Sequence, residues 1–162
     1  NSKSFLYYKV VHSNIGLSHI PKIYELCETE SCNYIIMELL GSNLLEYKRA
    51  MVSFNTQSIY RILFEVVDAI EQIHKKGVIH QDIKPSNILL SDNEIKLIDF
   101  GTSRMEEDVR VCDEISSHTY ASLNVHYGKV LSKKDDLWSF LFVVLDLLNE
   151  KLPWKDDKVF FI

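Results

Sequence analysis

The stretch VIHQDIKPSNILL, residues 78–90, and the tripeptide Asp99-Phe100-Gly101 that follows it carry most of the information about this chain's fold and chemistry. Two β-rich runs lie between the polar ends of these segments, Ile88 to Leu90 and Ile95 to Ile98. The tetrapeptide that joins them, SDNE, is rich in turn-forming residues, so the sequence predicts a hairpin. A hairpin brings its two ends together. We therefore expect the loop before it and the tripeptide after it to meet in space.

The polar residues of these two segments are those that phosphoryl transfer requires. That reaction needs a carboxylate to orient the attacking hydroxyl, a cation to meet the developing charge, and oxygen ligands for magnesium. Asp82 can supply the carboxylate and Lys84 the cation. Asn87 and Asp99 offer an amide oxygen and a carboxylate to the metal. Short patterns such as Asp-Phe-Gly recur by chance, but the combination at these spacings is specific. The sequence therefore predicts a site for phosphoryl transfer from ATP.

Hydrophobic periodicity predicts two long helices. From Thr56 to Lys76 apolar residues recur at the spacing of one helical face, and the segment ends in basic residues and Gly77, a typical helix stop. Ser132, with Asp135 three residues on, resembles a capping box and predicts a second helix that runs to about Asn149. Because that helix is apolar on nearly all sides, we expect it to be buried.

Shorter elements and a long loop complete the pattern. The β-rich runs Lys22–Leu26 and Tyr34–Met37 flank a polar segment and predict another hairpin. Residues 4–13 alternate weakly, which is compatible with a short helix. From Gly101 to about Ser122 the composition turns polar without any period, and this predicts a long surface loop.

Composition and charge exclude several classes of protein. The 162 residues are 46% hydrophobic, which is enough to form a core and does not fit a disordered chain. A net charge of −5 without a Lys/Arg stripe argues against nucleic-acid binding. The most apolar stretch, Leu137–Leu148, contains Asp146 and is too short to cross a bilayer, so we expect no membrane partner. Cys27, Cys32 and Cys112 lack zinc-ligand spacing and indicate a reducing compartment, either cytoplasm or nucleus.

At these spacings the two opening segments resemble the signature set of eukaryotic protein kinases. The stretches Tyr120–His126, Ser132–Trp138 and Leu152–Trp154 are similar to the casein kinase one group. Within that group, Asp135–Ser139 is similar to the tau-tubulin kinases, whereas Met37–Gly41 and Gly16–Ile23 are closer to casein kinase one itself. The resemblance implies an α+β protein kinase fold, with ATP and Mg²⁺ as cofactors and proteins as substrates. The oligomeric state is not indicated.

The same resemblance implies a division into lobes. Residues 1–37 would end the N-terminal lobe, residues 38–42 would form the hinge, and residues 43–162 would form an incomplete C-terminal lobe. Because the chain begins at Asn1 rather than Met and stops soon after Trp154, we expect a partial catalytic domain.

Each site residue receives a role from this resemblance. Asp82 would be the catalytic base and Lys84 the contact to the γ-phosphate. Asn87 and Asp99 would be the magnesium ligands. Asp136 matches a buried helix aspartate that tethers the backbone of the catalytic loop, although a simple acid at a helix N-terminus is the alternative.

The adenine site is implied in the same way. Met37 matches the gatekeeper, and the Glu38 carbonyl and Leu40 amide would hold adenine at the hinge. Leu89 matches the residue beneath the adenine ring.

Several features depart from the kinase pattern. The chain has no glycine-rich phosphate loop and no Val-Ala-x-Lys, and the glutamate that pairs with that lysine falls on or near Tyr7. The arginine expected between His80 and Asp82 is Gln81, so the charge that docks a phosphorylated activation loop is absent. A second arginine, which would help to bind phosphorylated substrates, is Thr119 here.

Two functions follow from this mixture of matches and departures. The first is an ATP-dependent serine/threonine protein kinase that transfers the γ-phosphate to protein hydroxyls. The alternative is a pseudokinase or truncated scaffold module that binds partners without catalysis. Because the lysine and the glycine-rich loop are missing, we expect these 162 residues alone to be inactive.

Overall fold

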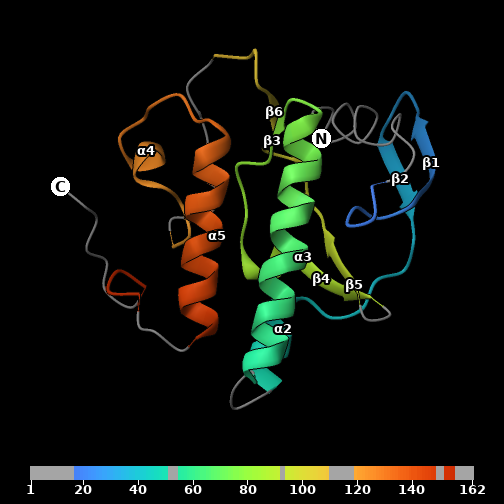
Figure 1. The fold of residues 1–162 in the computed structure, drawn as a ribbon. Helices are drawn as coiled ribbons and strands as arrows, with labels where there is room; N and C mark the ends of the chain where they lie inside the picture. Colours follow the sequence, from blue (N-terminus) through green and yellow to red (C-terminus); the bar gives the residue numbers. More distant parts are fainter. Residues whose placement is uncertain (1–16, 51–54, 92–93, 110–118, 149–151, 156–162) are drawn as a thin grey trace.

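In the described part of the computed structural model, two long helices stand side by side with three two-stranded sheets beside them (Figure 1). This mixture of helices and small antiparallel sheets is an α+β arrangement. The structure describes residues 17–50, 55–91, 94–109, 119–148 and 152–155.

Helix α3, Thr56–Lys75, is the longest described element and confirms the predicted helix to within one residue. It begins after Asn55, whose side chain accepts a hydrogen bond from the Ser58 backbone N–H (2.7 Å) and so caps the first turn. It ends before Gly77, whose φ of +72° is a left-handed conformation that glycine adopts without strain. The predicted apolar face is buried: Ile59, Ile62, Val66, Ala69, Ile70 and Ile73.

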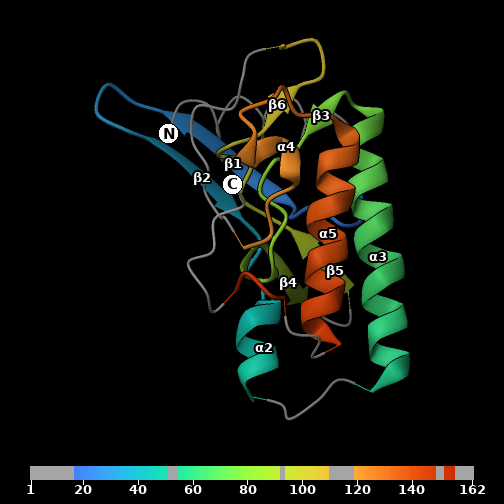
Figure 2. The same cartoon turned by 90° about the vertical axis from the view of Figure 1, so that its left-hand side faces the viewer.

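Helix α5, Lys133–Leu147, runs antiparallel to α3 and packs against it (Figures 1 and 2). Its start confirms the predicted cap, because the Ser132 backbone N–H and hydroxyl both donate to the Asp135 carboxylate (2.7 and 3.0 Å). The expectation that this helix is buried on nearly all sides is wrong. Its contacts with α3 occupy one side, and large hydrophobic residues on it remain about half exposed: Leu137, Trp138 and Leu141.

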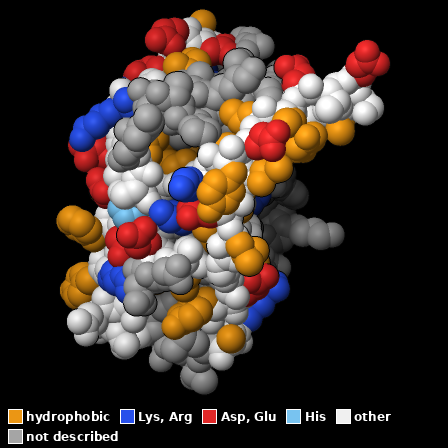
Figure 3. Space-filling model, turned by 90° about the vertical axis from the view of Figure 1, so that its right-hand side faces the viewer, with side chains coloured by type: hydrophobic (Ala, Val, Ile, Leu, Met, Phe, Trp, Pro, Cys, Tyr) orange, Lys and Arg blue, Asp and Glu red, His pale blue; other side chains and the backbone are white. Residues whose placement is uncertain are grey.

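Both predicted hairpins are present. Strand β1, Ile23–Glu28, pairs antiparallel with β2, Asn33–Met37, and the pair projects from the body as an arm (Figure 2). Hydrophobic side chains lie along this arm and acidic ones near its end (Figure 3). Strand β4, Ile88–Ser91, pairs with β5, Glu94–Leu97, in the register that places Ile88 opposite Leu97.

A third sheet corrects one part of the predicted surface loop from Gly101 to Ser122, of which residues 110–118 lie outside the described ranges. Strand β3, Val78–Ile79, pairs with β6, Arg104–Met105, and Arg104 is buried. A strand of two residues is too short to show a period, so only its distant partner reveals it. The short helices α2, Leu44–Ala50, and α4, Leu123–His126, also have no counterpart in the sequence prediction.

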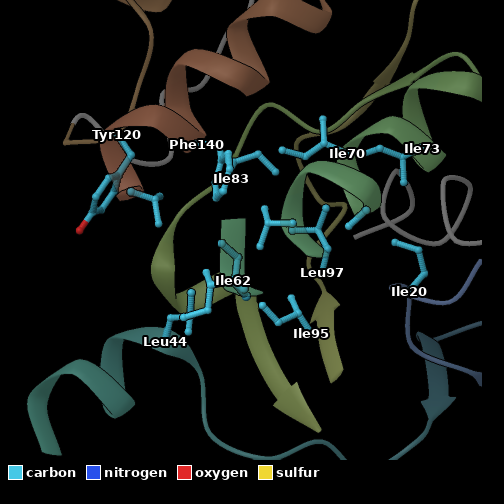
Figure 4. Close-up of a cluster of buried hydrophobic side chains, with 14 of the residues drawn as sticks. Ile20, Leu44, Ile62, Ile70, Ile73, Ile83, Ile95, Leu97, Tyr120 and Phe140 are labelled. Atoms are coloured by element: carbon cyan, nitrogen blue, oxygen red, sulfur yellow. The ribbon is translucent and has the colours of Figure 1, made fainter. Parts of the chain in front are cut away.

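The hydrophobic core joins α2, α3, α5 and the β4–β5 hairpin (Figure 4). It is built mainly from aliphatic side chains of these elements, including Leu44, Ile62, Ile70, Ile95, Leu97 and Val143, and from Ile83 of the loop that follows β3. The ring of Phe100 is fully buried, whereas Asp99 beside it is exposed. The core therefore anchors the tripeptide through its aromatic residue and leaves the acid accessible.

Some predictions concern residues outside the described ranges. The helix expected over residues 4–13, Tyr7 within it, and Cys112 all lie outside them. In the described part, no helix combines the length and the apolar character needed to cross a membrane.

Candidate active site

The loop from His80 to Asn87 links β3 to β4 and ends in one turn of 3-10 helix, η1, Pro85–Asn87. Proline suits the first position of such a turn, because its φ is already close to helical and no N–H is needed there. Lys84 before it is extended (φ −156°, ψ 162°), as the residue preceding a proline prefers. The turn closes with the Asn87 N–H donating to the Lys84 carbonyl (3.0 Å). Local sequence therefore determines the path of this loop.

Asp82, Lys84 and Asn87 form one hydrogen-bonded group. Lys84 Nζ lies 2.6 Å from Asp82 Oδ2. Asn87 Nδ2 donates to the same oxygen (3.0 Å) and to the Asp82 carbonyl (2.9 Å). Asp82 and Asn87 are both buried, and low-dielectric surroundings strengthen such bonds. Because both donors meet Oδ2, neither occupies Oδ1 of Asp82, which can accept a proton.

His80 connects this loop to the segment around the tripeptide. Its Nε2 lies 3.0 Å from the Ile98 carbonyl oxygen, and its Nδ1 accepts from the Asp82 backbone N–H (3.2 Å). A carbonyl only accepts and a backbone N–H only donates, so these contacts assign the neutral ring with its proton on Nε2. Burial lowers the pKa of His80, which favours the same form. The ring also packs against Phe100, with centroids 4.9 Å apart.

Asp136, in the first turn of α5, accepts hydrogen bonds from the backbone of the loop. Its Oδ2 accepts from the His80 N–H (2.9 Å), and its Oδ1 from the Gln81 N–H (2.8 Å). His74 Nε2, from α3, lies 2.7 Å from Oδ2. These are the contacts of the tether expected from the sequence. Since the carboxylate is also at a helix N-terminus, the positive end of the helix dipole favours its charge.

Gln81 and Asp99 are the non-glycine residues of the described chain with positive φ, 69° and 64°. Such a conformation costs about 1–3 kcal/mol per residue and persists where surrounding contacts outweigh that cost. The backbone of Gln81 is held by Asp136, and Asp99 Oδ1 accepts from the Gly101 N–H (3.2 Å). Strained residues cluster at functional sites, so their positions on both sides of Asp82 and Asn87 support a functional site here.

The β4–β5 hairpin brings Asn87 close to Asp99, as the sequence predicts. The Ile98 N–H, one residue before Asp99, donates to the Asn87 carbonyl (3.0 Å). The bonds from Asn87 to Asp82 use its amide nitrogen, so its amide oxygen is not consumed by them. An amide oxygen and a carboxylate are hard ligands that suit Mg²⁺, which usually takes one or two protein ligands and completes its shell with phosphates and water. The residue types fit that ion, and their role as ligands stays a prediction.

The four predicted adenine contacts lie along the connection from β2 to α2 and on β4. Met37 is the last residue of β2, Glu38 and Leu40 follow it, and Leu89 is in β4. All four are half-buried. An isolated β-bridge joins Leu89 to Asn43, so the connection passes beside β4. The structure thus brings Leu40 and Leu89 into one neighbourhood, and their contact with adenine stays a prediction.

Gly41 permits this close approach and was not found from the sequence. Its N–H donates to the Leu90 carbonyl (2.9 Å), and the Leu90 N–H donates to the Ser42 carbonyl (3.0 Å). A Cβ at position 41 would lie 2.4 Å from the Leu90 carbonyl oxygen, which is too close for any side chain. Glycine is therefore needed here for space rather than for its backbone freedom.

Asp146 organises a second buried cluster that was also missed. The Tyr120 hydroxyl donates to Asp146 Oδ2 (2.9 Å), and Lys155 and Lys48 lie 2.6 and 3.0 Å from Oδ1. Burial opposes ionisation, but hydrogen bonds from the two lysines and the tyrosine outweigh it and lower the pKa of Asp146. Burial and the neighbouring carboxylate raise the pKa of Tyr120. The sequence does contain a signal for this cluster: Asp146 is a single acid inside an apolar helix. A buried charge needs partners, so such an acid indicates polar or charged neighbours.

Comparisons with known proteins agree with this geometry. The family model for the protein kinase domain matches residues 8–160. A probable serine/threonine-protein kinase of Dictyostelium discoideum is 35% identical to the chain over 141 residues. That match covers 78% of this chain and 28% of the relative, so the chain spans little more than a quarter of that protein's length. On the family match and the site geometry together, this chain belongs to the protein kinase domain family.

Proposed function

We propose that this chain carries the catalytic loop of an ATP-dependent serine/threonine protein kinase of the casein kinase one group. The observation that carries the proposal is the bonded group of Asp82, Lys84 and Asn87 beside Asp99. Residues 1–37 then end the N-terminal lobe, residues 38–42 form the hinge, and residues 43–162 belong to the C-terminal lobe. The relative's name, a probable serine/threonine-protein kinase, favours serine and threonine hydroxyls of proteins as acceptors.

The reaction transfers the γ-phosphate of ATP to a protein hydroxyl. The hydroxyl oxygen forms a bond to the γ-phosphorus, the bond from that phosphorus to the β–γ bridging oxygen breaks, and ADP leaves. Asp82 orients the hydroxyl and accepts its proton on Oδ1, since Oδ2 already holds two donors. Lys84 faces the transferred phosphoryl group from beside Asp82. Asn87 and Asp99 would hold magnesium, and the ion would supply positive charge to offset the charge on the phosphate oxygens.

The same proposal places adenine against the hinge. The Glu38 carbonyl would accept from the adenine amino group, and the Leu40 N–H would donate to a ring nitrogen. Leu89 would lie beneath the adenine ring, and Met37 would contact the base as the gatekeeper. The hydrogen bonds that tie Gly41 and Ser42 to Leu90 support this arrangement, because they keep the hinge beside β4.

Thermal unfolding in the presence of nucleotide tests the binding site in this chain. A ligand that binds only the folded state stabilises it by RT ln(1 + [L]/Kd), so Mg·ATP should raise Tm. The increase should be lost when magnesium is omitted and in Asp99→Asn. Glu71→Gln, an exposed acid on α3, is the matched control and should keep the full shift. An undiminished magnesium-dependent shift in Asp99→Asn would contradict the metal assignment.

Phosphate transfer by the complete gene product tests the catalytic assignment. Asp82→Asn should lower kcat by about 10²–10⁴-fold, the usual contribution of a general base, while the nucleotide-induced Tm shift is retained. Nucleotide binding without any transfer in the unaltered protein would favour the alternative, a pseudokinase or scaffold module.

A further inference from the structure

The β1–β2 ladder is irregular at the point where the connection to α2 begins (Figure 1). Ile23 lies opposite Met37, so the next pair along the two chains is Lys22 and Glu38. The Glu38 N–H donates to the Lys22 carbonyl (2.9 Å). In a regular antiparallel ladder, two residues joined by such a bond exchange a second one, from the Lys22 N–H to the Glu38 carbonyl. That second backbone bond is absent from this described pair.

The side chain of Glu38 takes the place of the missing bond. The Lys22 N–H donates to Glu38 Oε1 (3.0 Å). A carboxylate oxygen has more than one lone pair, so Oε1 can also face the Lys96 ammonium, whose Nζ lies 3.7 Å away. The carboxylate therefore satisfies the same N–H that the Glu38 carbonyl satisfies in a regular ladder.

Lys96 holds this carboxylate from the body of the molecule. It is a residue of β5 and lies opposite Leu89 of β4. Its Nζ donates to the Ser18 carbonyl and lies 3.1 Å from Glu94 Oε2. Only 12% of the Lys96 side chain is exposed, so water screens its charge less than that of a surface lysine. Two donors from different segments thus fix the direction of the Glu38 side chain.

The consequence concerns the backbone carbonyl of Glu38. Because Oε1 already accepts from Lys22, the ladder does not use this carbonyl, and no residue of the described ranges donates to it. The Leu40 N–H likewise has no acceptor among the described residues. Backbone groups of half-buried residues need a partner, and here that partner must be water or a ligand. These are the two groups that the proposed contact with adenine requires.

We infer that Glu38 is a positioning residue whose carboxylate replaces its own carbonyl in the ladder and so leaves that carbonyl to accept a hydrogen bond from the base of a nucleotide. An acceptor at this position favours a base with an amino group over a base with an oxygen there. Glu38 thereby sets the preference between adenine and hypoxanthine nucleotides. The structural part stands on the contacts alone, and the preference rests on the proposed kinase function.

NMR of the full chain tests the structural part through scalar couplings across hydrogen bonds. Glu38→Leu removes the side-chain acceptor, so the Lys22 N–H should turn to the carbonyl of residue 38 as in a regular ladder. A coupling from the Lys22 amide nitrogen to that carbonyl carbon should then appear. In the unaltered chain the coupling should run instead to the carboxylate carbon of Glu38. A coupling to the backbone carbonyl in the unaltered chain would overturn the inference, and this measurement does not depend on the folding of the variant.

Binding of Mg·ATP and Mg·ITP to the full chain tests the preference. ITP has an oxygen where ATP has its amino group, so the unaltered chain should bind ATP at least about tenfold more tightly. In Glu38→Leu this ratio should fall at least about fivefold, because the carbonyl then accepts from Lys22. Glu38→Gln keeps an acceptor oxygen and should restore most of the ratio.

Glu28→Leu, the same change at an exposed position of β1, is the matched control and should keep the full ratio. An unchanged ratio in Glu38→Leu, or an equal fall in Glu28→Leu, would overturn the inference. If the unaltered chain binds neither nucleotide, the proposed adenine site fails, and the scalar couplings still decide whether the carboxylate replaces the carbonyl.

Discussion

The catalytic loop and the β1–β2 hairpin are held in opposite ways. Buried polar groups of the loop are bonded to α5 and to the segment after Asp99. The hairpin is tied at its base, where the Glu38 N–H donates to the Lys22 carbonyl (2.9 Å), and large hydrophobic residues along it are exposed: Tyr24, Tyr34 and Ile36. Removing a buried partner costs the full desolvation of the group left behind, whereas water replaces an exposed one. The stability of the site therefore depends on a few buried acceptors.

The largest effect is expected from Asp136→Ala. The change leaves the backbone N–H groups of His80 and Gln81 buried without their acceptor, and His74 without its carboxylate. We expect a loss of about 3–5 kcal/mol in the free energy of unfolding, measured by urea titration. Glu71→Ala removes an exposed ion pair with Lys75 and should cost less than about 1 kcal/mol. Equal losses would show that the loop does not depend on Asp136. If the alanine variant does not fold, Asp136→Asn, which keeps one acceptor oxygen, can be compared with Glu71→Gln.

A smaller loss is expected when the proposed hinge, residues 38–42, is forced away from β4. Gly41→Ala places a Cβ 2.4 Å from the Leu90 carbonyl, so the backbone must shift, at a cost of about 1–3 kcal/mol. Gly128→Ala is the matched control: its φ of +59° strains an alanine, but nothing lies within 4 Å of the added carbon. In a nucleotide titration, Gly41→Ala should also weaken the Tm shift with Mg·ATP, whereas Gly128→Ala should not. A weakened shift in both variants would argue against a local effect at the hinge.

The protonation of His80 gives a pH-dependent effect on the loop. Because burial lowers its pKa below the ordinary 6.5, the unfolded chain binds more protons between the two values. Stability from this residue is therefore full above about pH 6.5 and falls as the pH drops below it, by up to about 1.4 kcal/mol per pH unit. Urea titrations between about pH 5 and pH 7 should show a steeper dependence in the unaltered chain than in His80→Gln. Equal slopes would contradict a buried neutral ring.

Two carboxylates titrate in a separate range and do not disturb that measurement. For Asp135 and Asp146 burial alone would raise the pKa, but hydrogen bonds outweigh it and lower the pKa below the ordinary 3.8. Their contributions are present above that value and are lost only as the pH falls through it. These two carboxylates therefore do not affect the difference between the unaltered chain and His80→Gln in the range from about pH 5 to pH 7.

Features with a local signal were predictable, and features that depend on distant partners were not. The period and caps of α3 predicted that helix, and turn residues between β-rich runs predicted the β4–β5 hairpin and hence the approach of Asn87 to Asp99. Strand β6 is recognisable only through its pairing with β3. The burial of α5 was overestimated, since hydrophobicity indicates which residues favour burial but not how many sides of a helix the described chain covers.

The same distinction applies to individual side chains of the site. Asp82, Lys84 and Asn87 lie within one short loop, so their grouping follows from local spacing. The contact between Gln81 and Arg104 joins residues on opposite sides of the β4–β5 hairpin, and nothing in either local sequence indicates it. His74 likewise meets Asp136 only because α3 packs against α5. Tertiary packing therefore supplies the supporting contacts, and local sequence brings together the groups that we predict to react.

The smallest effect is expected in the hairpin, where Thr29→Ala removes a hydroxyl that donates to the Cys32 carbonyl (2.7 Å) and accepts from the Cys32 N–H (3.0 Å). Both groups are exposed, so water replaces the hydroxyl and the loss should stay below about 1 kcal/mol. Ser122→Ala removes a buried hydroxyl that donates to Asp135 Oδ1 (2.6 Å), and it should cost about 1.5–3 kcal/mol. Urea titration of the two variants compares the loss of a bonded hydroxyl in the two environments. If Thr29→Ala proved as costly as Ser122→Ala, burial would not be what separates the arm from the catalytic body, and the contrast between the two regions would fail.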